Sequence, residues 1–243
     1  MAPLVSVAGV TQSFGGVPVL QHLSLEVVAG EALGIVGPNG AGKTTLLNVI
    51  AGDLRPDKGT VTFDGRDVTG EGPDQRCRAG IARTSQIPRP FESLTVYENV
   101  LTAAVFGTPG RKRESRSADL AVESMRRSGL LAKANTPAAN LALLDRKRLE
   151  LSRALATQPR LLLLDEIAGG LTEAEVRVLI DEIRQIQADG VTIVWIEHIV
   201  HALLAVVGRI MAMSFGRKIA EGDAATVMRS AAVREVYLGV GGE

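Results

Sequence analysis

Two short stretches of the sequence carry residues suited to phosphate chemistry, and the first is GPNGAGKT (37–44). It matches the pattern G-x-x-x-x-G-K-[ST], in which glycines let the backbone curl so that successive N–H groups face an anion. The helix expected to follow adds the positive end of its dipole. Lys43 can then reach the β- and γ-phosphates of a nucleotide, and the Thr44 hydroxyl can bind Mg²⁺. The residues predicted to cradle the phosphates are Gly37, Pro38, Asn39, Gly40, Ala41, Gly42, Lys43, Thr44 and Thr45.

The second stretch, LLLLDEIAGG (161–170), runs an apolar segment into two adjacent carboxylates, Asp165 and Glu166. The apolar run predicts a strand that is buried on both faces. Acids at its end need a cation, a proton to handle or open water, because burying an unpaired carboxylate is costly. If this strand ends next to the phosphate loop, Asp165 can hold Mg²⁺, directly or through water, and Glu166 can orient the attacking water. The alternative is a strand that simply emerges into a polar loop.

The patterns along the chain predict the elements that position these residues. Short β-like runs over 1–30 predict antiparallel strands, EALGIVG (31–37) predicts a buried strand, and KTTLLNVIAG (43–52) predicts a helix ended by Gly52. The other expected elements are a hairpin on Asp64-Gly65 (59–68), a helix opened by a Thr95–Glu98 capping box, a solvated loop or helix start at RKRESR (111–116), a helix over 140–159 ended by Pro159, a helix over 173–189, a strand over 191–198, another helix, and a strand–hairpin–helix tail over 209–243.

This order of elements implies an α/β fold, in which a parallel sheet carries an antiparallel β-subdomain and an inserted α-helical subdomain. We expect one domain, with residues 1–87 and 150–216 forming the nucleotide-binding core and β-subdomain, and residues 88–149 forming the helical subdomain. The C-terminal tail (217–243) is interpreted as a packing element rather than a regulatory one. Ligands of parallel sheets bind beyond the C-terminal ends of the strands, where both motifs fall.

Composition limits the classes of function. The chain has 243 residues, 46% of them hydrophobic and 22% charged, which is typical of a globular protein. Lysines plus arginines and aspartates plus glutamates both number 27, so no overall positive charge favours nucleic acid. The single Cys77 fits a reducing compartment. We find no secretory signal at the N-terminus, and the longest apolar candidate (199–213) is interrupted by His201 and Arg209, too short to span a bilayer.

With these motifs in this order, the chain resembles the ATP-binding-cassette (ABC) ATPases over nearly its whole length. The resemblance implies a P-loop NTPase (RecA-like) core, ATP hydrolysis, and ATP and Mg²⁺ as cofactors. Gln86, after the strand GIARTS, matches the glutamine that in this family senses the metal and the attacking water and reports to the membrane partner. His198, ending VTIVWIEH, matches the histidine that contacts the γ-phosphate, although a histidine at a strand end can also be structural. Phe14 in TQSFGGVPVL matches the aromatic that stacks on adenine, and its alternative is a core aromatic.

These matches assign roles to the residues. The resemblance implies Glu166, His198 and Gln86 as the catalytic set, and it implies Thr44, Gln86 and Asp165 as the metal set.

The segment FESLTVYENV and the tail GRKIAEGD…VREVYLG look most like the ATPase subunits of importers for branched-chain amino acids and related small polar solutes. That likeness implies a peripheral protein on the cytoplasmic face of the inner (plasma) membrane, driving two transmembrane permease subunits and working indirectly with a solute-binding protein, without nucleic acid. A surface around Gln86 and residues 87–100 would receive a helix of the membrane partner. The alternatives are a soluble ABC ATPase that acts on nucleic acid or ribosomes, and a weakly hydrolysing nucleotide sensor.

One motif departs from the family pattern. The signature L-S-G-G-Q, which crosses a dimer interface to bind the γ-phosphate held by the other subunit, is replaced here by LALLD (141–145). Ala142 lacks the serine hydroxyl, and two leucines stand where glycines permit close approach. Thr172 stands where the family usually has Asp, and Ile167 stands where it commonly has Pro. Because each site takes its signature from the partner, we hypothesise a heterodimer with a second ATPase subunit, while a homodimer remains possible.

Overall fold

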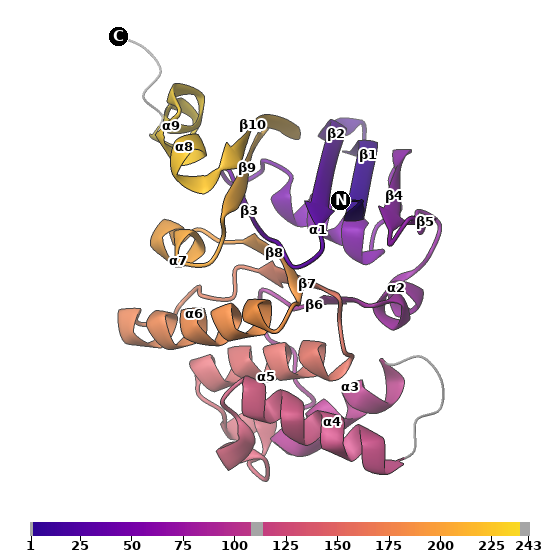
Figure 1. Cartoon of the computed structure of the whole chain (residues 1–243), viewed down its shortest axis with the longest axis vertical. Helices are drawn as coiled ribbons and strands as arrows, with labels where there is room; N and C mark the ends of the chain where they lie inside the picture. The colour runs from indigo at the N-terminus through magenta and orange to yellow at the C-terminus, as the bar shows by residue number, and fades with distance from the viewer. Residues whose placement is uncertain (1, 108–113, 239–243) are drawn as a thin grey trace.

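The computed structural model describes residues 2–107 and 114–238 (Figure 1). Its strands are β1 (Pro3–Phe14), β2 (Val17–Val28), β3 (Ala32–Val36), β4 (Lys58–Phe63), β5 (Arg66–Asp67), β6 (Ile81–Arg83), β7 (Leu161–Asp165), β8 (Thr192–Ile196), β9 (Arg209–Ser214) and β10 (Arg217–Asp223). Its α-helices are α1 (Lys43–Ala51), α2 (Pro73–Ala79), α3 (Val96–Phe106), α4 (Glu114–Arg127), α5 (Leu143–Ala156), α6 (Glu173–Ala188), α7 (Val200–Leu204), α8 (Ala224–Arg229) and α9 (Ala231–Leu238), joined by the short 3₁₀ helices η1 (Leu131–Lys133) and η2 (Ala138–Asn140).

A six-stranded sheet in the order β10-β9-β3-β8-β7-β6 forms the centre of the molecule. Its pairs are parallel except β9–β10, which confirms the predicted parallel core. The four leucines of β7 are fully buried and alternate between two hydrophobic clusters, one on each face of the sheet. β8 lies between β3 and β7, so the strand ending in Asp165 is one strand removed from the strand that leads into the phosphate loop, and not its direct neighbour.

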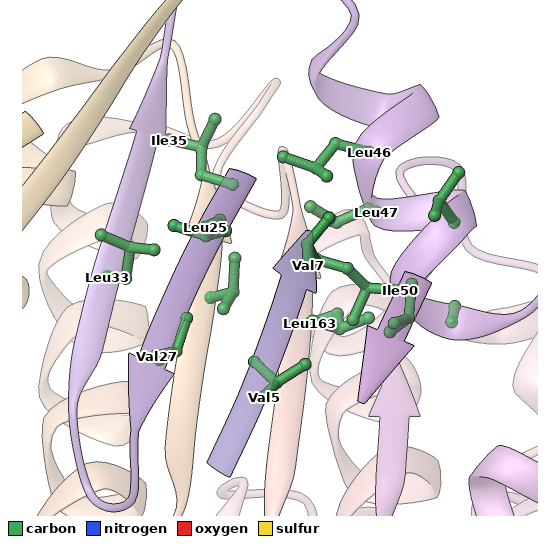
Figure 2. Close-up of a cluster of buried hydrophobic side chains, with 14 of the residues drawn as sticks. Val5, Val7, Leu25, Val27, Leu33, Ile35, Leu46, Leu47, Ile50 and Leu163 are labelled. Carbon is green, nitrogen blue, oxygen red and sulfur yellow. The ribbon is translucent and has the colours of Figure 1, made fainter. Parts of the chain in front are cut away.

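The β-subdomain is an antiparallel sheet of β2, β1, β4 and β5, as the sequence predicts. Its hairpin turns at Asp64-Gly65, where both residues have positive φ, as a type I′ turn requires. Valines and leucines of β1 and β2 pack with α1 against one face of the six-stranded sheet (Figure 2). This shared cluster fixes α1, and therefore the loop that precedes it, against both sheets.

The helical subdomain consists of α3 and α4 packed against one side of α5, gathered at one end of the molecule (Figure 1). Thr95 opens α3 with the predicted capping box, since its side chain accepts a hydrogen bond from the Glu98 N–H. Of the segment RKRESR (111–116), residues 111–113 lie outside the described part of the chain, and α4 begins at Glu114. The position of the subdomain boundaries in the sequence remains a prediction.

The helix predicted over 140–159 is shorter at both ends. Residues 138–140 form η2, and Leu141 and Ala142 are extended, so α5 begins at Leu143. At the other end α5 stops at Ala156, and Gln158, which precedes Pro159, has a φ of +57°, the left-handed conformation that commonly follows the last turn of a helix. α5 contributes to the cluster of the helical subdomain and also to the cluster under the main sheet, and so connects the two.

The C-terminal segment returns to the main sheet. β10 pairs with β9 at the edge of the sheet, and α8 and α9 bury Ala224, Val227 and Val233 against its face. Between residues 2 and 107 and between 114 and 238, no helix has both the length and the apolar character needed to cross a bilayer.

Candidate active site

The loop between β3 and α1 forms a cradle of backbone. Gly42 precedes α1 with a φ of +94°, and a side chain there would place its Cβ 2.6 Å from the carbonyl oxygen of Val19. The Gly216 N–H donates to the Ala41 carbonyl at 3.1 Å, so the β9–β10 turn supports the loop from behind. Only glycine satisfies both the conformation and the close approach at residue 42. The cradle is therefore formed by the fold before any ligand binds.

Lys43 lies inside the cradle rather than in solvent. Its side chain is 6% exposed, and Nζ donates to the carbonyls of Gly37 at 2.7 Å and Pro38 at 3.0 Å. Burial lowers the pKa of Lys43, and the nearby carboxylates of Glu166 and Asp165 oppose that change. The amine is thus held close to the point where phosphates would lie.

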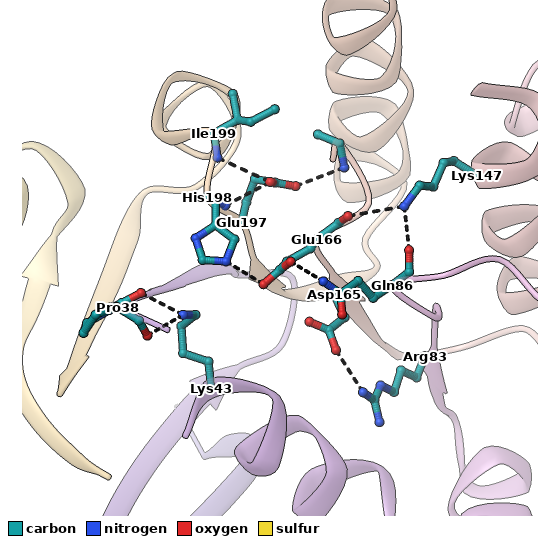
Figure 3. Close-up of polar contacts among 12 residues, drawn as sticks. Pro38, Lys43, Arg83, Gln86, Lys147, Asp165, Glu166, Glu197, His198 and Ile199 are labelled. Carbon is teal, nitrogen blue, oxygen red and sulfur yellow. Dashed lines mark hydrogen bonds and ion pairs between the residues drawn. The ribbon is translucent and has the colours of Figure 1, made fainter. Parts of the chain in front are cut away.

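Glu166 is held between Gln86 and His198 (Figure 3). Its Oε1 lies 2.6 Å from His198 Nε2, and its Oε2 accepts a hydrogen bond from Gln86 Nε2 at 2.5 Å. Its backbone has a φ of +48°, an uncommon conformation for a residue other than glycine, and its N–H donates to the Ile196 carbonyl. These contacts direct the carboxylate away from the strand axis and toward the phosphate loop.

One cavity of about 680 Å³ is lined by the loop between β3 and α1 and by the three residues predicted to be catalytic. Its lining residues are Val19, Asn39, Gly40, Ala41, Gly42, Lys43, Thr44, Thr45, Gln86, Glu166 and His198. The fold therefore brings the phosphate loop together with Gln86, Glu166 and His198, which follow three different strands of the main sheet. A cavity with a cationic cradle on one side and a carboxylate on the other can hold a phosphate and a water aligned for attack.

Asp165 lies beside this cavity and is 1% exposed. Its Oδ2 accepts from Arg83 Nη2 at 2.9 Å, whereas its Oδ1 is buried and has no hydrogen-bond partner among the described residues. A second cavity of about 580 Å³ places Asp165 with Thr44 and Gln86. An unpartnered carboxylate oxygen near a hydroxyl and an amide suits the oxygen ligands of Mg²⁺, with phosphates completing the shell. No cluster of three or more metal-ligating side chains occurs in the described part of the chain, so Asp165 would not hold an ion alone.

Phe14 ends β1 and is 51% exposed, so it does not belong to the core of the β-subdomain. It pairs with Val17 of β2, two residues before Val19, which lines the cavity. Its ring is not part of the cavity lining itself. Stacking of Phe14 on adenine remains a prediction.

Two residues of the site were missed by the sequence reasoning. Lys147 is 5% exposed, and its Nζ donates to the carbonyls of Gln86 at 2.6 Å and Glu166 at 3.4 Å. Burial lowers its pKa, while the carboxylates of Glu197 and Glu166 oppose that change. Glu197 is 1% exposed and accepts from the N–H groups of Ala168 at 3.0 Å and His198 at 2.9 Å.

Both residues had a signal in the sequence. Lys147 stands four residues before Leu151 and eight before Leu155, at an apolar position of its helix. Glu197 ends a buried strand, as Asp165 does.

Replacing Lys147 by methionine is expected to lower the kcat of ATP hydrolysis about tenfold to hundredfold while leaving ATP affinity unchanged. Lys147 ties the backbones of Gln86 and Glu166 together but does not line the phosphate cavity. Steady-state hydrolysis would measure the kcat, and an ATP titration would measure the affinity. Lys58→Met, which replaces an exposed lysine on β4, is the control. A kcat equal to that of the unmodified protein would contradict this role.

The segment LALLD (141–145) forms the start of α5. Ala142 is the N-cap and its side chain makes no capping bond. Leu143 is 42% exposed and lies against Gly170, where an added Cβ would meet its Cδ2 at 3.1 Å. Asp145 turns inward to ion pairs with Lys133 and Arg148. The helix N-terminus is therefore kept, but no side chain of these five presents a hydroxyl.

Thr172 and Ile167, the two other departures from the family pattern, both have places in the local structure. Thr172 is the N-cap of α6 and forms a capping box with Glu175. Threonine and aspartate are both favoured at this position, so the change from the family's usual Asp keeps the cap. Ile167 is 2% exposed and belongs to the cluster under the main sheet.

Comparison with known proteins gives a consistent result. A family model described as "ABC transporter" matches residues 20–169, and one described as "Branched-chain amino acid ATP-binding cassette transporter" matches residues 217–243. The high-affinity branched-chain amino acid transport ATP-binding protein LivG of Salmonella typhimurium is 36% identical, with 98% of each chain covered. LivG of Escherichia coli is 35% identical with the same coverage, and BraF of Pseudomonas aeruginosa is 32% identical, also over 98% of each chain.

Solved structures of similar proteins agree with the fold. A nucleotide-free ATP-binding cassette from an ABC transporter has a TM-score of 0.88 and 29% identity, covering 99% of this chain and 100% of that one. A cassette in its ADP conformation has a TM-score of 0.89 and 29% identity, covering 98% and 100%.

Proposed function

The chain belongs to the ABC transporter family and is an ATPase, and on that premise we propose that it energises the import of branched-chain amino acids or a related small polar solute. The observation that carries the catalytic part is the cavity in which the phosphate loop faces Glu166 between Gln86 and His198. The substrate class is supported by the names of full-length relatives and by the match of residues 217–243.

The residues in and beside the cavity have proposed roles in hydrolysis. The backbone N–H groups of the loop and Lys43 bind the β- and γ-phosphates of ATP, and Phe14 stacks on the adenine. Thr44, Gln86 and Asp165 would hold Mg²⁺, which would neutralise charge on the phosphate oxygens. Glu166 orients the attacking water and accepts its proton, and His198 contacts the γ-phosphate. The contacts of Gln86 and His198 with Glu166 keep the carboxylate in one orientation while these steps occur.

We propose that a helix of the membrane partner docks in a groove between the core and the helical subdomain. The groove has a volume of about 560 Å³ and lies between α2 and β6 on one side and α3 and α5 on the other. Ile87 and Phe91 on the segment after Gln86, and Phe106 at the end of α3, are 70%, 47% and 74% exposed. Phe106 lines the groove, whereas Ile87 and Phe91 are not among its lining residues, and exposed apolar side chains of this kind suit an apolar helix face. The chain would then sit peripherally on the cytoplasmic side of the membrane.

The altered signature supports a heterodimer. The half of the composite site made by this chain's loop, Glu166 and His198 has every side chain that the family pattern requires. The half offered to a partner at the start of α5 has no hydroxyl and exposes Leu143. A second ATPase subunit with its own signature would complete this chain's site, and most hydrolysis would occur there.

The proposed transport role predicts an uptake defect. Deleting the gene for this chain from its host should lower the initial rate of uptake of radiolabelled leucine at least tenfold. Expression of the wild-type chain should restore that rate. Complementation by Glu166→Gln should fail although the protein accumulates to the same level. Unchanged uptake of leucine, isoleucine and valine in the deletion strain would contradict the substrate class, and co-sedimentation with ribosomes instead of membranes would contradict the transport role.

A further inference from the structure

Arg83 ends β6 at the boundary between two cavities. It lines the metal-side cavity together with Thr44 and Asp165, and it also lines the docking groove. The residues shared by both linings are Asp53, Arg83, Ser85 and Arg89. A charged side chain at this boundary can act on the metal site from the groove side.

The guanidinium of Arg83 is divided between two acidic partners. Nη2 donates to Asp165 Oδ2 at 2.9 Å, whereas Nη1 donates to Asp53 Oδ2 at 2.9 Å and to the side-chain oxygen of Asn48. The Asp165 side chain is 1% exposed, while those of Arg83 and Asp53 are 21% and 44% exposed. The pair with Asp165 is therefore the desolvated arm, and the pair with Asp53 faces water.

The two carboxylate oxygens of Asp165 therefore have different surroundings. One oxygen is taken by Arg83, and the other is buried without a hydrogen-bond partner among the described residues. Figure 3 shows Arg83 approaching Asp165 from the side away from Lys43. An ion bound at the remaining oxygen would lie close to a fixed positive charge that belongs to neither the phosphate loop nor the catalytic set.

We propose that Arg83 is a positioning residue that lowers the Mg²⁺ affinity of the site, because it pairs with one oxygen of Asp165 and so places a fixed positive charge beside the carboxylate that would hold the metal. This inference rests on the proposed role of Asp165 in binding Mg²⁺.

Two effects of Arg83 on Mg²⁺ binding have opposite signs. Arg83 fixes the orientation of the carboxylate, and losing that order would weaken Mg²⁺ binding by no more than about fivefold. It also places a full positive charge beside the cation, in a site where Asp165 is desolvated. Repulsion of this kind exceeds the ordering effect even after allowance for the partly exposed guanidinium. Arg83 therefore lowers Mg²⁺ affinity, and its removal should raise that affinity.

The test is a Mg²⁺ titration of the binding of a nonhydrolysable ATP analogue to the full chain, followed by calorimetry. For Arg83→Gln we expect the half-saturating Mg²⁺ concentration to fall about tenfold. Arg83→Lys keeps the charge, although it cannot hold both acids at once, and it should not lower the half-saturating concentration. Arg160→Gln is the matched control, because Arg160 forms an exposed two-bond pair with Asp64 far from the site, and it should change nothing.

A purely structural role predicts a different outcome. In that case Arg83→Gln lowers the thermal unfolding temperature equally with and without Mg²⁺ and nucleotide. The half-saturating Mg²⁺ concentration is then unchanged or raised, and this result would overturn the inference.

If Arg83→Gln does not fold, Asp53→Asn tests the same claim. Losing the water-facing arm should turn Arg83 more fully to Asp165 and raise the half-saturating Mg²⁺ concentration about twofold. A fall or no change would overturn the inference. If the wild-type chain binds the ATP analogue equally well with and without Mg²⁺, the proposed role of Asp165 is contradicted instead.

Discussion

Replacing Glu166 by glutamine is expected to lower the rate of ATP hydrolysis by a factor of about 10² to 10⁴ while ATP still binds. Glutamine keeps the size and one acceptor oxygen but cannot take a proton from water. The effect should be large because Glu166 is the carboxylate that lines the phosphate cavity, held at 2.6 Å from His198 Nε2. The measurement is steady-state phosphate release by the complex purified through a tag on this chain.

The size of the residual rate in that complex also reports on the asymmetry of the dimer. The second composite site depends on the start of α5, which lacks a hydroxyl, so it should contribute little. A Glu166→Gln complex that keeps half or more of the wild-type rate would contradict the assignment of most hydrolysis to this chain's site. Glu173→Gln, an exposed acid at the start of α6, is a suitable control and should not change the rate.

Replacing Lys43 by alanine should weaken ATP binding about 100-fold or more. A hydrogen bond to a charged group contributes about 1.5–3 kcal/mol, and Lys43 can contact two phosphates. The amine is already directed into the cradle by the carbonyls of Gly37 and Pro38, so no other lysine can replace it without moving the loop. Equilibrium binding of a fluorescent ATP analogue to the purified chain measures the loss.

The control for this variant is Lys58→Ala, which removes an exposed lysine on β4. It should bind ATP as the wild type does. If Lys43→Ala kept its ATP affinity and its unfolding temperature, the loop would not be the phosphate site, and the interpretation of the whole cavity would be wrong.

Residues on regular elements with strong local signals were predictable from the sequence. The glycines and Lys43 follow a pattern whose backbone geometry is local, and the leucines before Asp165 must be buried whichever fold they join. The same holds for Thr95, whose capping box needs only Glu98 three residues later. These features depend on neighbours in the chain, and the structure confirms the elements that they define.

The contacts that hold the site together were not predictable, because they depend on tertiary packing. Arg83 meets Asp165 only because β6 pairs with β7, and Lys147 reaches the backbone of Gln86 only because α5 packs beneath the main sheet. Among the three cations of DRKR (145–148), the helical spacing to Leu151 and Leu155 marks Lys147 as the buried one, but it does not indicate which groups the amine meets. The order of β3, β8 and β7 is likewise a property of the sheet and not of any single strand.

This chain provides a complete half-site for ATP, but its signature at the start of α5 lacks a hydroxyl, and we therefore expect its closed state to need a different partner. Light scattering on purified Glu166→Gln protein, with and without ATP and Mg²⁺, tests this most directly, because blocking hydrolysis traps any closed dimer. We expect a protein that binds ATP and stays monomeric. A nucleotide-dependent shift to a dimer would show that Ala142, Leu143 and Leu144 still close a site, and would contradict the heterodimer.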